Sequence, residues 1–417
     1  MKQLLLLWWP RLELNDIEQR TFGRHLLAAL LDGVYAGLIS VTAYVLRREL
    51  HATALQIALL YSLQMSMFAF SSIGASIITT GNHRRVMLVA GLIGRFSYLW
   101  IMLWHTPASF ITIAALVGLC HATYLPAQNM IFRTNYRRAS RGVCYARAQI
   151  VALLGTSSSA WLVGRFLNWK ASAFPLAFAA AGLCGLGAYL AYRSMPNPGI
   201  GAELHRARRL PYADFFEILR TDHFFRRYEL YFFLYGVAFM ITEPLVPMLV
   251  NDVFRADWSQ ASRVFGVIHP LVMIVFLPLY GRMLDRTGAV PLAALAYVAL
   301  AFWPFSLAVA RSVDGAYVAY AFFGVGMAGV DVAWMLGANT FAPRERIQSY
   351  MGVHVTMVGL RAMSAPYLGL LLKETLGFRA AFSCSTLLLV GAACLMVRLH
   401  RQCARQETGC READEGA

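Results

Sequence analysis

The sequence predicts an all-α membrane protein of twelve transmembrane helices in two six-helix pseudo-symmetric bundles. The chain has 417 residues, of which 58% are hydrophobic and only 14% are charged. This composition is too apolar for an ordinary soluble protein. Its apolar stretches repeatedly reach the ~20 residues that a helix needs to cross a bilayer. Landmarks of the first half also return in the second at a spacing of roughly 210 residues, which indicates a duplicated unit.

Apolar segments separated by short Arg-rich breaks predict the twelve helices. Six precede a long polar stretch, at 24–48, 54–80, 85–104, 107–132, 145–166 and 172–193. Six follow it, at 228–252, 262–284, 289–310, 313–341, 347–372 and 378–399. The expected domains are an interfacial N-terminal segment (1–23), a first bundle (24–193), a basic linker (194–227), a second bundle (228–399) and a tail (400–417).

Lys and Arg residues divide unequally between the two sides of the predicted membrane. With both termini and every second break on one side, 26 of the 37 lie there, nine lie opposite, and Arg95 and Arg361 fall within helices. The excess of positive charge marks the cytoplasmic side of a membrane. We therefore expect a multi-pass protein of the bacterial inner membrane, with both termini and the basic linker in the cytoplasm.

Several classes of function are disfavoured. The formal net charge of +15 comes from arginines at loop ends, not along one polar face, so nucleic acid is not an expected partner. The seven cysteines form no Cys-x-x-Cys pair, which leaves no disulfide framework or zinc site. Since no phosphate-binding loop or nucleophile arrangement is visible, we expect neither a cofactor nor an enzyme.

The internal repeat is visible in three pairs of landmarks. The paired positions are Gly74 and Gly281, 207 apart; Asn129 and Asn339, 210 apart; and Trp169 and Phe378, 209 apart. Three pairs at nearly one offset indicate duplication of a six-helix unit.

The segment GRMLDRTG, from Gly281 to Gly288, resembles the loop signature of the major facilitator superfamily, and the resemblance extends over essentially the whole chain. It implies a monomeric transporter in which this loop acts as a gate latch. Gly281 would allow close backbone approach, Asp285 would cap a helix or pair with an arginine, next to Arg286, and Gly288 would allow the turn.

The first-half copy of this loop departs from the pattern. Ile78 takes the place of the acid, while four positions of the signature remain: Gly74, Gly81, Arg84 and Arg85. A second signature, typical of the superfamily's antiporters, is half present, because 152–164 has the glycines but no proline. Export by antiport is therefore favoured over import.

Four ionisable residues stand at matching places in the two halves. Asp32 and Glu243 are 211 apart, and His121 and Asp331 are 210 apart. The resemblance implies that their helices line a central cavity. Because a charge in a membrane-spanning helix costs ~2.5–3.5 kcal/mol, each is a candidate for proton coupling or substrate binding. Arg361 is the expected counter-charge, and the alternative is that such charges form structural ion pairs, for instance Arg361 with Asp331.

Further residues on the same helices could hydrogen-bond or stack on a substrate: Tyr35, Tyr124, Gln128, Asn129, Trp334 and Asn339. Arg95 is expected to snorkel or to pair at a gate. The sequence thus predicts a proton-coupled secondary transporter of a small organic solute, cationic or zwitterionic, exporting it by alternating access.

Two alternatives remain. His269 and Met273 are one helical turn apart and present soft ligands that suit Cu(I). This pair resembles the His and Met pairing of copper importers in the same superfamily, so uptake of copper or another metal ion is the second hypothesis. The third is a membrane scaffold or sensor that transports nothing, which would not need matched charges in its cavity helices.

Overall fold

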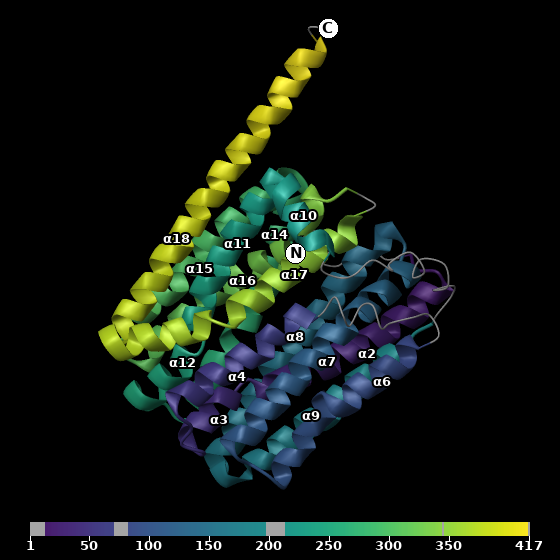
Figure 1. Ribbon diagram of the computed structural model, residues 1–417. Helices are drawn as coiled ribbons and strands as arrows, with labels where there is room; N and C mark the ends of the chain where they lie inside the picture. The colour runs from purple at the N-terminus through teal and green to yellow at the C-terminus, as the bar shows by residue number, and fades with distance from the viewer. Residues whose placement is uncertain (1–12, 71–81, 197–212, 344–345, 416–417) are drawn as a thin grey trace, which may run out of the picture.

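The computed structural model describes residues 13–70, 82–196, 213–343 and 346–415. In these residues the secondary structure is entirely helical, and Figure 1 shows the helices packed side by side in two groups, purple-blue and teal-yellow. The last helix, α18, runs beyond the body of the protein towards the C-terminus.

The first group contains α2 (Asp16–Ile39), α3 (Thr42–Arg48), α4 (Ala54–Ser66), η1 (Met67–Phe70), α6 (His83–Ile93), η2 (Arg95–Met102), α7 (Pro107–Asn135), α8 (Arg138–Trp169), η3 (Ala171–Ala173) and α9 (Phe174–Arg193). The second contains α10 (Ala213–Thr221), α11 (His223–Thr242), α12 (Leu245–Met248), η5 (Leu249–Val253), α13 (Trp258–Ser262), η6 (Arg263–Val267), α14 (Ile268–Thr287), α15 (Ala289–Val309), α16 (Val313–Phe341), α17 (Ile347–Ala362) and α18 (Ala365–Glu415).

In the described part of the chain, ten helices are long and apolar enough to cross a membrane. The last of these, Ser349–Arg405, is 57 residues long and breaks at Gly377, whose φ of 83° is not helical. It therefore provides two spans, and the shorter apolar helix Ala54–Phe70 provides another. The predicted all-α fold with twelve transmembrane helices is confirmed.

Helix caps explain where the structure departs from the predicted boundaries. Asn15 and Glu18 form a capping box, so α2 begins at Asp16, inside the segment expected to be interfacial. Asp222 accepts from the backbone N–H groups of Phe224 and Phe225, so α11 begins inside the predicted linker. The linker also contains α10, and the predicted tail continues α18.

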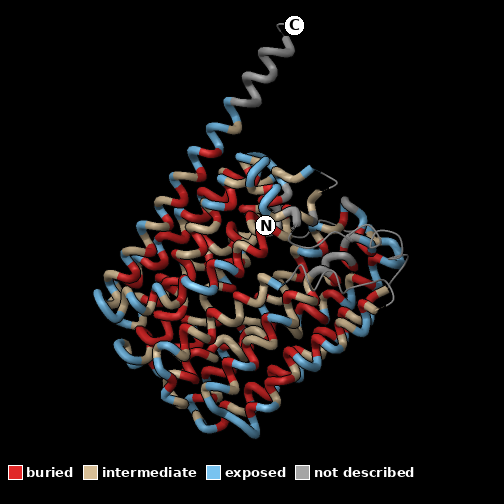
Figure 2. The backbone as a smooth tube through the Cα atoms, in the orientation of Figure 1, coloured by how far each residue is buried: buried red, intermediate tan, exposed pale blue. Residues whose placement is uncertain are grey.

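Side chains divide between a packed interior and an apolar exterior. In Figure 2 the buried residues run along the inner faces of the helices. Many large apolar side chains point outwards, with exposed fractions of 67% for Leu103 and 72% for Leu387. An outer surface of this kind suits contact with lipid chains.

The two halves meet mainly along two helices of the first half, α4 and α8. α4 packs against α17 and α18, and α8 packs against α13, η6 and α14. Two glycines allow the second contact to be close: a Cβ at Gly164 would lie 1.9 Å from Ser262 Oγ, and one at Gly266 would lie 2.4 Å from Ala160 Cβ.

Candidate functional site

In the first half, Asp32 is held by an arginine from another helix. Arg95, at the start of η2, donates to Asp32 Oδ1, and the Tyr192 hydroxyl of α9 donates to Asp32 Oδ2 at 2.9 Å. Arg95 is 8% exposed, and such a buried charge needs a partner. The sequence left open whether Arg95 snorkels to the interface or forms a pair. In the structure it does not snorkel, and it neutralises Asp32.

Aromatic rings complete the surroundings of this ion pair. The Arg95 guanidinium lies 4.4 Å from the centre of the Tyr35 ring and 4.8 Å from that of Tyr189, distances suited to cation–π attraction. A Cβ at Gly185 would lie 2.7 Å from Arg95 Cβ, so this glycine leaves room for the arginine. The pair is fixed between η2, α2 and α9.

His121 lies near the same pair. Its ring centre is 5.6 Å from that of Phe68 and 6.3 Å from that of Tyr124. Asp32 and Arg95 are both close enough for a Coulombic interaction with the imidazole. The structure thus brings together the two members of the predicted tetrad that belong to the first half.

The two carboxylates of the second half, Glu243 and Asp331, form no hydrogen bond or ion pair with any described residue. Both lie within Coulombic range of the Tyr235 hydroxyl on α11. Each also interacts electrostatically with a tyrosine of the first half, Glu243 with Tyr61 and Asp331 with Tyr145. Each acid therefore has a tyrosine of the other half among its electrostatic neighbours, and Glu243 also has Tyr320 of its own half.

Arg361 does not pair with Asp331 in this structure. It is 4% exposed and donates from Nη1 to the Phe232 carbonyl at 2.8 Å. Its guanidinium also lies 5.3 Å from the ring centre of Phe232 and 5.2 Å from that of Tyr235. The acid that interacts electrostatically with it is Glu229, so Arg361 belongs to the interior of the second half.

The position of Arg361 depends on Gly236. A Cβ at residue 236 would lie 1.8 Å from Arg361 Cζ. We expect Gly236→Ala to displace the guanidinium and to destabilise the protein by ~1–3 kcal/mol, because the packed interior must shift. Chemical denaturation of the detergent-purified protein measures this change. Gly391→Ala is the matched control, since a Cβ there would meet nothing within 4 Å; an equal loss in both variants would contradict the packing argument.

Sequence reasoning missed a buried pair in the second half. His354 Nδ1 lies 2.8 Å from Glu229 Oε1, and both side chains are at most 1% exposed. Glu229 stands 211 residues after Glu18, the spacing that also relates Asp32 to Glu243. The repeat was therefore a usable signal for this position.

Glu18 has the corresponding role in the first half. Its carboxylate accepts from the Ser140 hydroxyl and from the Arg137 backbone N–H at 2.9 Å. The Arg137 side chain pairs with it at 2.9 Å, and this hydrogen bond raises the pKa of Arg137. In each half a glutamate on the first transmembrane helix thus links that helix to the fifth: α2 to α8 in the first half, and α11 to α17 in the second.

The other predicted cavity residues are less closely connected. The Tyr124 ring packs tilted against Tyr189, 4.3 Å between ring centres, and so touches one of the rings around Arg95. Trp334 lies 6.0 Å from the His354 ring, while Gln128 is half-buried. The side chains of Asn129 and Asn339 lie outside the described part of the structure.

Polar contacts between the halves gather at the end of the bundle opposite the linker, which we call the distal end. Arg47 of α3 pairs with Asp252 of η5 at 2.6 Å, and its Nε donates to both carboxylate oxygens. The Tyr44 hydroxyl donates to the Ala256 carbonyl, and Asn168 accepts from the Trp258 N–H at 2.9 Å. The two halves are therefore tied together at the distal end.

The predicted gate segment 281–288 lies at the opposite end, where residues 281–287 form the last turns of α14 and not a loop. Gly288 has a φ of 81° and ends the helix. A Cβ at Gly281 would meet no atom of the described residues within 4 Å, so none of their backbone approaches closely there. Asp285 and Arg286 are exposed and make no hydrogen bond or ion pair with any described residue.

The first-half copy of the loop is only partly described. Gly74, Ile78 and Gly81 lie outside the described residues. Arg84 donates to the Met195 carbonyl at 3.4 Å, a contact within its own half. Arg85 is exposed at the start of α6.

The possible copper ligands lie on one face of α14. His269 packs against Phe323, 5.2 Å between ring centres, and against Tyr320 at 6.1 Å. Its Nδ1 is buried and has no hydrogen-bond partner, and Met273 is 5% exposed. Within the described residues no three His, Cys, Asp or Glu side chains gather in a way that could hold a metal ion.

The sequence model described as Major Facilitator Superfamily matches residues 26–360. No curated protein sequence matches the chain.

Solved transporter structures share the fold. A mutant of the nucleoside transporter NupG aligns with a TM-score of 0.69 and 12% identity, over 92% of this chain and 100% of that one. The human organic anion transporter MFSD10 aligns with a TM-score of 0.66 and 16% identity, over 92% of this chain and 100% of that one. A bacterial homologue of the human lysosomal transporter Spinster aligns with a TM-score of 0.66 and 14% identity, over 93% of this chain and 97% of that one. At these identities the likeness concerns the fold alone.

Proposed function

Because this chain belongs to the major facilitator superfamily, we propose that it is a secondary active transporter that moves a small organic solute by alternating access, coupled to protons. Export in exchange for protons is the direction that the glycine-rich segment 152–164 favours. The solute is cationic or zwitterionic, since Glu243 and Asp331 offer negative charge that no basic side chain of the described residues neutralises.

One observation carries this proposal: Glu243 and Asp331 have no partner among the described residues, and each interacts electrostatically with a tyrosine of the other half. These tyrosines are Tyr61 and Tyr145. Asp32, by contrast, is already neutralised by Arg95. A carboxylate without a partner can take up a proton or a cationic group at little structural cost, whereas a paired one must first lose its partner. Proton exchange is thus assigned to the second half.

The location follows from the distribution of positive charge. We place the protein in the bacterial inner membrane as a monomer, with the linker and both termini in the cytoplasm. The distal end then faces away from the cytoplasm, and the contacts there act as an outer gate. No nucleotide-binding motif is visible in the chain, so an ion gradient is the proposed source of energy.

The outer gate provides a test of alternating access. Arg47 and Asp252 have side chains 28% and 29% exposed, and a pair so accessible contributes ~0.2–1 kcal/mol. Asp252→Asn is expected to shift the population towards opening at the distal end by about 1.4- to 5-fold. Labelling of a cysteine placed at the buried Ala261 of α13 by a membrane-impermeant thiol reagent reports this opening. Glu374→Gln is the control, and equal labelling in both backgrounds would contradict the gate.

Substrate identity is approached by thermal unfolding of the purified protein with a panel of amines, amino acids, nucleosides and Cu(I). A ligand at about 100 times its Kd stabilises by ~2.7 kcal/mol. Each hit is then tested for flux into proteoliposomes with and without an imposed pH gradient. Organic cations whose flux follows the gradient are the expected result. Stabilisation by Cu(I) alone would overturn the organic-solute proposal.

A further inference from the structure

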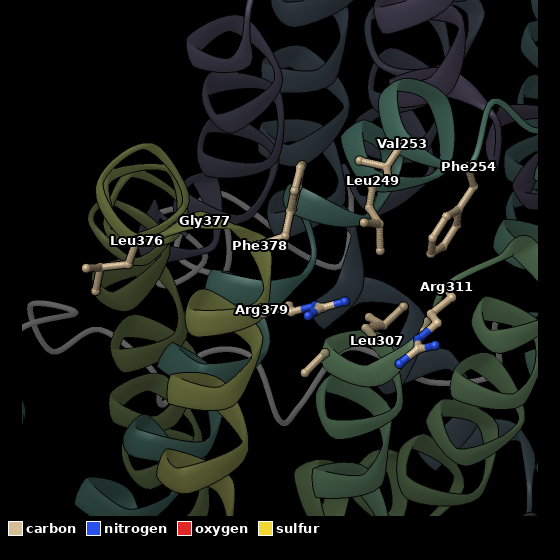
Figure 3. A pocket seen from close by; sticks show the side chains of 11 residues that line it. Leu249, Val253, Phe254, Leu307, Arg311, Leu376, Gly377, Phe378 and Arg379 are labelled. Atoms are coloured by element: carbon tan, nitrogen blue, oxygen red, sulfur yellow. The ribbon is translucent and has the colours of Figure 1, made fainter.

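A cavity of about 480 Å³ lies at the distal end of the second half, lined by none of the charged residues assigned to transport. Its walls come from η5, from the end of α15 and from the bend of α18 at Gly377. Figure 3 shows its apolar side chains, which include Leu249, Phe254, Leu307 and Phe378. The volume is in the range of sites for small ligands, ~300–1,000 Å³.

Two arginines reach over this cavity from different segments. Arg311 follows α15 and Arg379 follows Gly377, and Figure 3 shows both guanidinium groups extending over the same space. Neither forms a hydrogen bond or ion pair with any described residue. Two unpaired positive charges directed at one space repel each other, and an anion between them would replace repulsion by charge-assisted hydrogen bonds.

The acids closest in sequence to the cavity walls are already engaged. Asp252 is paired with Arg47 at 2.6 Å, and Glu374 with Lys373 at 2.6 Å. Among the described residues, no acidic side chain lines the cavity itself. The positive charge of Arg311 and Arg379 is therefore left for a ligand.

The rim of the cavity indicates where such a ligand comes from. Val253 is 54% exposed and Leu376 is 66% exposed, and both stand where helices end or bend. Apolar side chains at the end of a membrane-spanning bundle meet lipid, and arginines at the same level meet headgroups. An amphiphilic anion matches both features, whereas a free phosphate matches only the arginines.

We propose that this cavity binds an anionic phospholipid, with its phosphate between Arg311 and Arg379 and the start of an acyl chain along Leu307 and Phe378. The site is independent of the transported solute. Because η5 lines the cavity and also carries Asp252, a bound lipid touches the segment that closes the distal end.

The test is a titration of the full-length protein in neutral detergent with three probes: short-chain phosphatidylglycerol, short-chain phosphatidylcholine and glycerol 3-phosphate. Binding is followed by native mass spectrometry and thermal unfolding. Phosphatidylglycerol is expected to bind most tightly. The double variant Arg311→Gln/Arg379→Gln should weaken it at least tenfold, while the charge-conserving Arg311→Lys/Arg379→Lys variant should keep most of the affinity. Lys170→Gln, a distal-end charge outside the cavity, is the control and should change nothing.

Three results would overturn the proposal. The first is an unchanged affinity in the double Gln variant, which would place the lipid elsewhere. The second is equal binding of the zwitterionic and anionic lipids, which would remove the role of the arginines. The third is equally tight binding of glycerol 3-phosphate, which would identify a soluble anion as the ligand in place of a lipid.

Discussion

Replacing Glu243 by Gln and Asp331 by Asn is expected to lower proton-driven flux by about 100-fold in the double variant, because neither unpaired carboxylate then remains to exchange protons. Each single variant should lose at least about tenfold. Flux is measured in proteoliposomes with an imposed pH gradient, using a solute identified by thermal unfolding. Neither acid has a partner among the described residues, so the variants should remain folded.

A second assay separates proton coupling from binding. Exchange of labelled for unlabelled solute, without a pH gradient, needs alternating access but no net proton movement. It should persist in Asp331→Asn if that residue serves proton coupling alone. Asp314→Asn is the matched control, an exposed acid in the first turn of the same helix. Gradient-driven flux at the wild-type rate in the double variant would contradict the assignment of Glu243 and Asp331.

Arg95→Met is expected to be among the most destabilising single substitutions, at ~3–5 kcal/mol, because it leaves the Asp32 carboxylate without its counter-charge. The double variant Asp32→Asn/Arg95→Met should recover much of this loss, since it removes both charges. Chemical denaturation in detergent measures the free energies of unfolding, and Arg165→Met, an exposed arginine on α8, is the control. A double variant no more stable than Arg95→Met would show that the pair is not coupled.

The fold could be predicted from the sequence because the bilayer imposes it. Apolar segments long enough to span a membrane have few alternatives to helices, and the spacing of Gly74 and Gly281 revealed the repeat. The ends of helices were predicted less well. Asn15 and Asp222 each begin a helix through a side-chain cap, a local interaction that an apolar pattern does not show.

The candidate site was predictable in its members but not in its pairing. The repeat identified Asp32 and Glu243, yet which acid has a partner depends on how each helix is rotated about its axis. Arg95 turned out to face Asp32, and Arg361 to face the interior of its own half. Glu229, although it stands at the repeat spacing from Glu18, pairs with His354, and only tertiary packing reveals this.

The same distinction applies to the gates. GRMLDRTG was the most recognisable segment of the sequence, but Asp285 is unpaired within the described residues. The polar contacts that join the halves at the distal end come from Tyr44, Arg47 and Asn168. Their importance arises from side chains meeting across the two halves, and no local motif marks them.

The most direct test of alternating access is a pair of distance measurements between spin labels on a cysteine-free background. One pair, Lys170→Cys with Ser312→Cys, spans the distal end, and the other, Gly142→Cys with Thr287→Cys, spans the end nearer the linker; all four positions are exposed. Acidic pH or bound solute should lengthen one distance while shortening the other. Two single, unchanging distances under all conditions would contradict the account.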